Sequence, residues 1–140
     1  MTGPELAREY VDAFNRRDFE GRLALFAEDA VLFDPFFPEP TRGREAIRAL
    51  DENVQKAFSN MRWRLLHPAI HVDNSVVMEI GVEAVNDGPL DLPDGTVPAT
   101  GKSIAYESCS VLTLGTDGLI LEERSYFDAT GVAAQLGLLG

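Results

Sequence analysis

Two aspartates, a tyrosine and a run of hydroxyl side chains are the residues whose chemistry suits proton transfer. Asp34 stands after Phe33 and before Pro35 and Phe36, an apolar setting that would raise its pKa toward the range of a general base. Tyr10 follows the apolar face of an N-terminal helical pattern, where a phenol pointing into a cavity could donate to an oxygen that gains negative charge. These residues predict acid–base chemistry on an uncharged organic substrate.

Each of these residues also has a purely structural interpretation. An aspartate directly before proline often forms a turn by bonding nearby backbone amides, as Asp34 could. Tyr10 could simply fill the core. Asp128 follows a strand pattern and precedes a run of small residues, so it could be an acid or base, or the N-cap of a helix. The residues alone leave these alternatives open.

The helices that position these side chains fall in the first half of the chain. Thr2-Gly3-Pro4-Glu5 is a capping box with proline in the first turn, and it predicts a helix that runs to about Arg16. Asp18 predicts the N-cap of a shorter helix whose buried stripe reaches Phe26. A short strand over Val31–Asp34 follows. The apolar spacing of Ile47, Leu50, Val54 and Phe58 then predicts a third helix starting at Arg44.

The second half of the chain is typical of strands. We predict four of them, with hairpin turns at Asp73-Asn74 and Asp117-Gly118, and a closing helix over 129–139. The connection 87–102 is rich in proline, glycine and aspartate, which predicts an exposed loop that could cover the site. Helices first and strands afterwards indicate an α+β domain. The predicted strands are Met61–Val72, Ser75–Asn86, Ser103–Leu114 and Leu119–Phe127.

A pocket between the helices and the sheet follows from the strand alternation. Met78, Ile80, Val82 and Ala84 share one face of the second long strand, and this apolar face should point inward. The row Tyr106, Ser108, Ser110, Leu112 and Leu114 mixes hydroxyls with apolar groups, which suits a ligand cavity better than a dry core. The predicted lining is Tyr10, Phe14, Asp34, Trp63, Ile80, Val82, Tyr106, Ser108, Ser110 and Phe127.

Composition excludes several partners. With 140 residues and 45% hydrophobic residues, the chain fits one domain spanning 1–140. Its 12 basic and 23 acidic residues give a net charge of −11, which argues against nucleic acid or anionic membrane as partners. One cysteine, Cys109, allows no internal disulfide, and we expect neither metal nor cofactor. The absence of a leader-like pattern predicts a cytoplasmic protein.

Several strings resemble the nuclear-transport-factor-two-like superfamily, in particular its ketosteroid isomerase and SnoaL-like polyketide cyclase branches. Glu9-Tyr10-Val11-Asp12-Ala13-Phe14-Asn15 resembles the opening helix, and Phe33-Asp34-Pro35 with Glu39-Pro40-Thr41-Arg42-Gly43 resembles the segment of ketosteroid isomerases that holds their base. Tyr126-Phe127-Asp128 with Gln135-Leu136-Gly137 resembles the cyclases. The resemblance implies a cone-shaped, curved antiparallel or mixed sheet wrapped around three N-terminal helices, as in cystatin-like folds.

The resemblance also implies roles for individual residues. Asp34 matches the proton-abstracting aspartate of the isomerases, Tyr10 their oxygen-side donor, and Asp128 the acid–base aspartate of the cyclases. Ser110 stands where the isomerases carry a second, protonated aspartate, so a steroid-type oxyanion hole is incomplete. The strands lack the Arg-x-Asp of limonene epoxide hydrolases, which argues against epoxide hydrolysis.

These features predict a cofactor-independent isomerase or aldol cyclase for a hydrophobic carbonyl compound, with Asp34 or Asp128 as base. A non-catalytic ligand-binding or dimerisation module of the same fold is the alternative. We also expect a homodimer through the outer sheet face, and the two histidines, His67 and His71, lie too far apart along one strand to share a ligand. Residues expected on that outer face are Ala105, Glu107, Cys109, Val111, Ile120 and Arg124.

Overall fold

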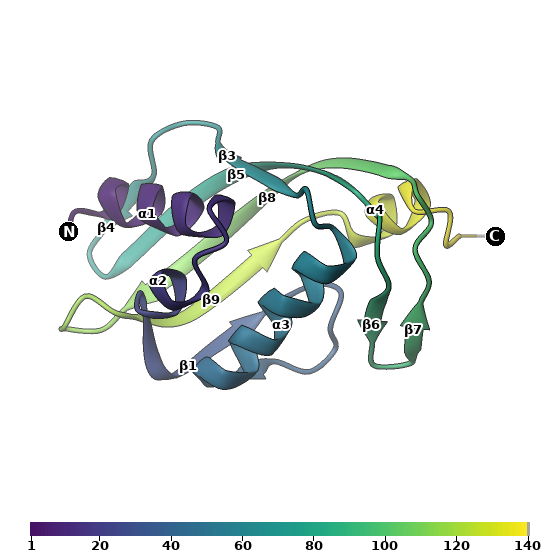
Figure 1. The fold of residues 1–140 in the computed structure, drawn as a ribbon. Helices are drawn as coiled ribbons and strands as arrows, with labels where there is room; N and C mark the ends of the chain where they lie inside the picture. Colours follow the sequence, from purple (N-terminus) through teal and green to yellow (C-terminus); the bar gives the residue numbers. More distant parts are fainter. Residues whose placement is uncertain (140) are drawn as a thin grey trace.

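Three helices pack over one face of a curved, mixed sheet, with a fourth helix near the C-terminus (Figure 1). The structure is a computed structural model, and it describes residues 1–139. The α+β architecture expected from the sequence is confirmed. The helices are α1 (Gly3–Asn15), α2 (Phe19–Leu23), α3 (Arg44–Ala57) and α4 (Ala129–Gln135).

The main sheet is open and has the strand order β2-β1-β9-β8-β5-β3, with β4 paired to β5. All its pairs are antiparallel except β1 with β9, which run parallel. A separate hairpin of β6 and β7 projects beside α3 (Figure 1). The strands are β1 (Phe26–Phe33), β2 (Thr41–Arg42), β3 (Arg62–Leu65), β4 (Ile70–Val72), β5 (Ser75–Val85), β6 (Leu90–Leu92), β7 (Gly95–Val97), β8 (Ser103–Leu114) and β9 (Ile120–Tyr126).

The predicted capping box starts α1. Thr2 Oγ1 accepts a hydrogen bond from the Glu5 amide at 3.1 Å, and Glu5 Oε1 accepts one from the Thr2 amide at 3.1 Å. These bonds satisfy two amides that the first helical turn leaves free. The apolar face of α1 buries Tyr10 and Phe14, which are each 2% exposed. The helix thus carries both aromatic rings to the sheet.

The first strand is longer than the sequence predicted. β1 begins at Phe26, which we expected on the stripe of the second helix, and not at Val31. The helix α2 ends at Leu23, and Phe26 is instead paired with Ile120 of β9 and fully buried. Pairing with a strand nearly a hundred residues away outweighs the local helical spacing at this position.

Two other predicted elements are divided. The strand expected over Met61–Val72 is interrupted at 66–69, where Pro68 cannot donate to a ladder, and it forms β3 and β4. The connection 87–102 is not wholly irregular, because it contains the β6–β7 hairpin. The predicted closing helix forms α4, which ends at Gln135.

The inward face of β5 is the predicted one, since Met78, Ile80, Val82 and Ala84 are all buried. The prediction that Ile120 lies on the outer face is wrong, because its side chain is fully buried. The β8–β9 pairing shifts register between Thr113 and Leu114, which leaves Leu121 out of the alternation and 43% exposed. This one-residue irregularity turns Ile120 to the inner side.

Candidate functional site

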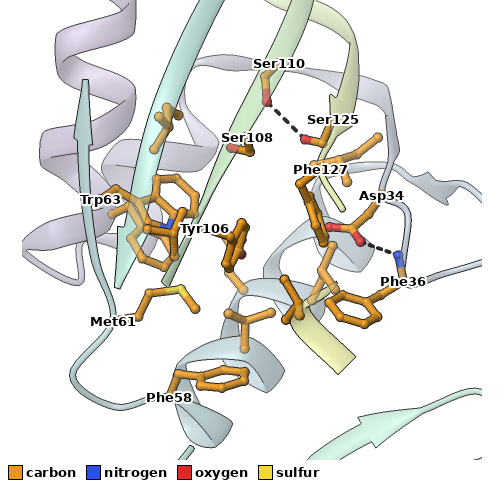
Figure 2. A pocket seen from close by; sticks show the side chains of 18 of the residues that line it. Asp34, Phe36, Phe58, Met61, Trp63, Tyr106, Ser108, Ser110, Ser125 and Phe127 are labelled. Atoms are coloured by element: carbon orange, nitrogen blue, oxygen red, sulfur yellow. Dashed lines mark hydrogen bonds between the residues drawn. The ribbon is translucent and has the colours of Figure 1, made fainter. Parts of the chain in front are cut away.

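A cavity of about 120 Å³ lies between α1, α3 and the concave face of the sheet, and α4 closes one end with Val132 and Leu136. Its wall is mainly aromatic and aliphatic (Figure 2). The structure brings ten of the residues singled out in the sequence to this one cavity. They are Tyr10, Phe14, Asp34, Trp63, Ile80, Val82, Tyr106, Ser108, Ser110 and Phe127.

Asp34 follows the last residue of β1 and lines the cavity near Phe36 and Phe127 (Figure 2). Its Oδ1 accepts a hydrogen bond from the Phe36 amide at 2.8 Å, so the turn expected before Pro35 forms as well. Burial raises the pKa of Asp34 to about 6, although the Phe36 amide opposes this and the charge of Glu123 adds to it. Asp34 therefore exchanges a proton close to neutral pH.

Glu123 of β9 is a second carboxylate in the cavity and is only 3% exposed. Tyr10 Oη donates to its Oε1 at 2.5 Å. Ser110 Oγ and Ser125 Oγ donate to its Oε2 at 3.2 and 3.0 Å. Burial, together with the Glu123 charge, raises the pKa of Tyr10 well above its ordinary value, while Arg22 opposes the shift. The hydroxyls of Tyr10 and Ser110 are thus engaged by a carboxylate.

A buried ion pair packs against the Tyr10 ring. Arg22 Nε donates to Asp51 Oδ2 at 2.7 Å, and both side chains are almost fully buried. The Arg22 guanidinium also lies over the Tyr10 ring, with Cζ 4.4 Å from the ring centroid. Burial alone would lower the pKa of Arg22, but Asp51, Tyr10 and Glu123 reverse this and raise it. Arg22 therefore stays charged and links Asp51 to the aromatic wall.

Stacked rings form one side of the cavity. Trp63 of β3 packs against Phe14, with ring centroids 3.5 Å apart, and against Tyr10 at 5.7 Å. On the opposite side, Phe127 lies between Phe36 at 5.4 Å and Tyr106 at 5.0 Å. Figure 2 shows Trp63 and Phe127 on either side of the space, with Tyr106 between them. The cavity suits a flat or ring-shaped apolar ligand.

Asp128, the other candidate base, lies outside the cavity. Its side chain is exposed and its Oδ1 accepts a hydrogen bond from the Gly131 amide at 2.8 Å, at the start of α4. This is the helix N-cap geometry that the sequence left open. The structure therefore does not bring Asp128 together with Asp34.

The histidines are likewise remote from the cavity. His67 Nε2 pairs with Glu79 Oε1 at 2.7 Å on the surface, and His71 Nδ1 accepts from the Gly3 amide at 3.1 Å. Over residues 1–139, no group of three or more histidine, cysteine, aspartate or glutamate side chains could hold a metal ion. No helix in that range is long and apolar enough to cross a membrane.

Four polar residues of the cavity were not expected from the sequence: Arg22, Asp51, Glu123 and Ser125. A signal existed for three of them. Glu123 and Ser125 alternate with the outward Arg124, and Asp51 stands four residues after Ile47 on the apolar face of α3. For Arg22 the sequence carries no sign of burial, because an isolated arginine beside Leu23 is normally exposed to solvent.

Comparison with known proteins agrees with this fold. The family model of the SnoaL-like domain matches residues 7–123. The chain belongs to the SnoaL-like family, within the nuclear-transport-factor-two-like superfamily. Solved structures share the fold: a protein assigned to the SnoaL-like polyketide cyclases from Jannaschia sp. CCS1 has a TM-score of 0.82 at 17% identity, covering 99% of this chain and 92% of that one.

Another solved structure shares the fold, and one curated protein is similar in sequence but much longer. A ketosteroid isomerase-like protein from Catenulispora acidiphila, solved with trimethylamine, has a TM-score of 0.78 at 20% identity and covers 98% of this chain and 95% of that chain. The epoxide hydrolase LasB of Streptomyces lasalocidi is 34% identical over 127 residues, which are 90% of this chain. The chain spans 41% of the length of LasB.

Proposed function

We propose that this chain is a cofactor-independent enzyme that moves a proton next to a carbonyl group of a hydrophobic substrate. Membership of the SnoaL-like family supports a small-molecule-binding, isomerase-like or cyclase-like role. The observation that carries the finer proposal is Asp34, a carboxylate with a pKa of about 6 on the wall of an apolar cavity. We assign the reaction to the cytoplasm, as expected from the sequence.

In the proposed reaction, the Asp34 carboxylate takes a proton from the carbon beside the carbonyl. The electron pair of that C–H bond forms a C=C bond, and the carbonyl π electrons move to oxygen, giving an enolate or enol. Returning the proton to another carbon of the conjugated system gives isomerisation. Attack of the enolate carbon on a second carbonyl, with the proton passed to the new alkoxide, gives aldol cyclisation. Both outcomes need one base of suitable pKa.

The cavity restricts the substrate. Its volume of about 120 Å³ is close to the roughly 150 Å³ of an engineered protein cavity that binds benzene, so it holds about one ring. Leu50, Val54 and Phe58 of the α3 side extend the apolar wall. We therefore favour a monocyclic or linear ketone, or one ring of a larger compound whose remainder extends outward past the Phe36–Pro38 segment.

Deuterium exchange tests the proposal directly. The chain is incubated in D₂O with a panel of enolisable cyclic ketones and polyketide-like esters, and exchange is followed by NMR. Wild-type protein should exchange at least one compound, and Asp34→Asn should slow that exchange by about 10²- to 10⁴-fold. The exposed Asp128→Asn variant is the matched control and should exchange at the wild-type rate. No exchange of any compound would favour the non-catalytic binding module.

Epoxide opening is a second candidate. LasB is an epoxide hydrolase, and the missing Arg-x-Asp excludes only one way to organise such a site. A carboxyl group with a pKa of about 6 is partly protonated near neutral pH, so Asp34 could protonate an epoxide oxygen as its C–O bond breaks. A water oxygen then forms the new C–O bond, and the proton that this water loses returns to the Asp34 carboxylate, which gives a diol. Assaying monocyclic epoxides beside the ketones distinguishes the two: Asp34-dependent diol formation without ketone exchange would favour this candidate.

A further inference from the structure

The hydroxyl of Tyr10, implied by the family resemblance as the oxygen-side donor, has a different acceptor in this chain. Tyr10 Oη lies 2.5 Å from Glu123 Oε1, within the range of a short hydrogen bond to a carboxylate. Ser110 donates to the other oxygen of Glu123 at 3.2 Å. A donor already bound to a carboxylate gains little by turning to a neutral carbonyl oxygen. The substrate oxygen therefore needs another donor.

Within residues 1–139, the hydroxyls of Tyr106 and Ser108 have no hydrogen-bond partner, unlike the cavity hydroxyls of Tyr10, Ser110 and Ser125. Both lie on the inward face of β8, two residues apart, and both line the cavity. Figure 2 draws a hydrogen bond between Ser110 and Ser125 and one from the Phe36 amide to Asp34, and none that joins Tyr106 or Ser108 to the other residues drawn. Both side chains are half-buried, so their oxygens remain accessible from the cavity.

Aromatic contacts connect Tyr106 to the segment that follows the proposed base. The Tyr106 ring packs on Phe127 at 5.0 Å, Phe127 packs on Phe36 at 5.4 Å, and the Phe36 amide donates to Asp34 at 2.8 Å. Burial raises the pKa of Tyr106, and the charge of Asp34 raises it further. A phenol with a raised pKa keeps its proton and so acts as a hydrogen-bond donor.

We propose that Tyr106, and not Tyr10, donates the hydrogen bond to the substrate oxygen on which charge develops, with Ser108 beside it. The assignment rests on the proposed function of Asp34. A carbonyl oxygen and its neighbouring carbon are only two bonds apart, so base and donor must line the same cavity, and Asp34 and Tyr106 both do. Tyr10 and Ser110 then act through Glu123 as positioning residues.

A phenolate binding experiment tests the donor without turnover. In the Asp34→Asn protein, the neutral amide stands in for the protonated acid that follows proton abstraction, and 4-nitrophenol supplies an enolate-like oxygen whose ionised form is coloured. We expect this protein to bind 4-nitrophenolate, and adding Tyr106→Phe to weaken binding about 10-fold and to raise the pKa of the bound phenol. Adding Tyr126→Phe, which removes a hydroxyl from a residue 57% exposed, should change neither.

The outcomes separate the two proposals. Equal binding with and without the Tyr106 hydroxyl, or no binding to the Asp34→Asn protein, overturns the donor assignment and leaves Asp34-dependent exchange untouched. Tyr106-dependent binding without any ketone exchange supports Tyr106 as the oxygen-binding group and contradicts the proposed catalysis. Thermal melts of each variant check folding. If Tyr106→Phe does not fold, the same measurement on Ser108→Ala, expected to weaken binding by a few-fold, decides.

Discussion

Tyr10 in the first helix donates a 2.5 Å hydrogen bond to Glu123 in the last strand, across 113 positions of the chain. Both side chains are buried, so neither could replace this bond with water. The bond ties α1 to β9 and fixes the floor of the cavity. The role of Tyr10 is therefore best tested by measuring the stability of a variant, and the role of Tyr106 by measuring ligand binding.

We expect Tyr10→Phe to lower the free energy of unfolding by about 1–3 kcal/mol, because Glu123 loses a donor and stays buried. Urea titrations followed by circular dichroism measure this. Tyr126→Phe is the matched control, since the Tyr126 side chain is exposed. Equal stability of the two variants would show that Glu123 does not depend on Tyr10.

The buried pair of Arg22 and Asp51 should be more costly to break than a surface pair. Asp51→Ala leaves the Arg22 charge without its nearest carboxylate, and we expect a loss of about 3–5 kcal/mol. Glu52→Ala, next in sequence, removes an exposed partner of Arg48 and should cost below about 1 kcal/mol. Similar losses for both variants would contradict the buried pairing.

We expect the rate of deuterium exchange to depend on pH through the ionisation of Asp34. Because the base must be ionised, the exchange rate should rise with pH and reach half its plateau near the pKa of about 6. The pH–rate profile of any exchanged ketone measures this. A midpoint near pH 4, the range of an ordinary exposed aspartate, would show that Asp34 is not the titrating base.

The free energy of unfolding should also depend on the protonation of Asp34. It should fall as pH rises, whereas the exchange rate should rise. Burial raises the pKa of Asp34, so the folded chain holds a proton that the unfolded chain releases at a lower pH. The stability this contributes is complete below the ordinary pKa of aspartate and is lost as pH rises through about 6. We therefore expect Asp34→Asn to gain stability relative to wild type between about pH 4 and pH 7, as urea titrations at both values would show.

Asp128 should matter for the last helix and not for chemistry. Asp128→Ala removes the acceptor of the Gly131 amide, and we expect a loss of about 0.5–2 kcal/mol. Because Val132 and Leu136 of α4 close the cavity, binding of 4-nitrophenolate should weaken only to the extent that α4 frays. An exchange rate reduced as strongly as in Asp34→Asn would restore the cyclase-type assignment.

We also propose a homodimer through the outer face of β8, where Ala105, Cys109 and Val111 stand beside Glu107. Light scattering at micromolar concentration should give about twice 15.3 kDa. Val111→Glu should shift the mass toward the monomer, whereas Thr116→Glu, in an exposed turn, should not. A monomeric mass for the wild-type chain would contradict the dimer.

Features that depend on a few neighbouring residues could be predicted from the sequence. The capping box at Thr2, the alternation along β5 and β8, and the turn at Asp34 each follow from hydrogen bonds or side-chain directions within one element. For that reason the cavity residues on β5 and β8, such as Ile80 and Tyr106, could be predicted from the sequence.

The contacts between polar groups of distant elements could not be predicted from the sequence. Phe26 joins a strand because Ile120 pairs with it, and Ile120 turns inward because the β8–β9 register shifts by one residue. Glu123 accepts the hydrogen bond of Tyr10 because the packing of α1 on the sheet brings together two side chains that lie 113 positions apart in the chain. Such contacts depend on how elements far apart in the chain pack together, and the spacing of neighbouring residues does not indicate this.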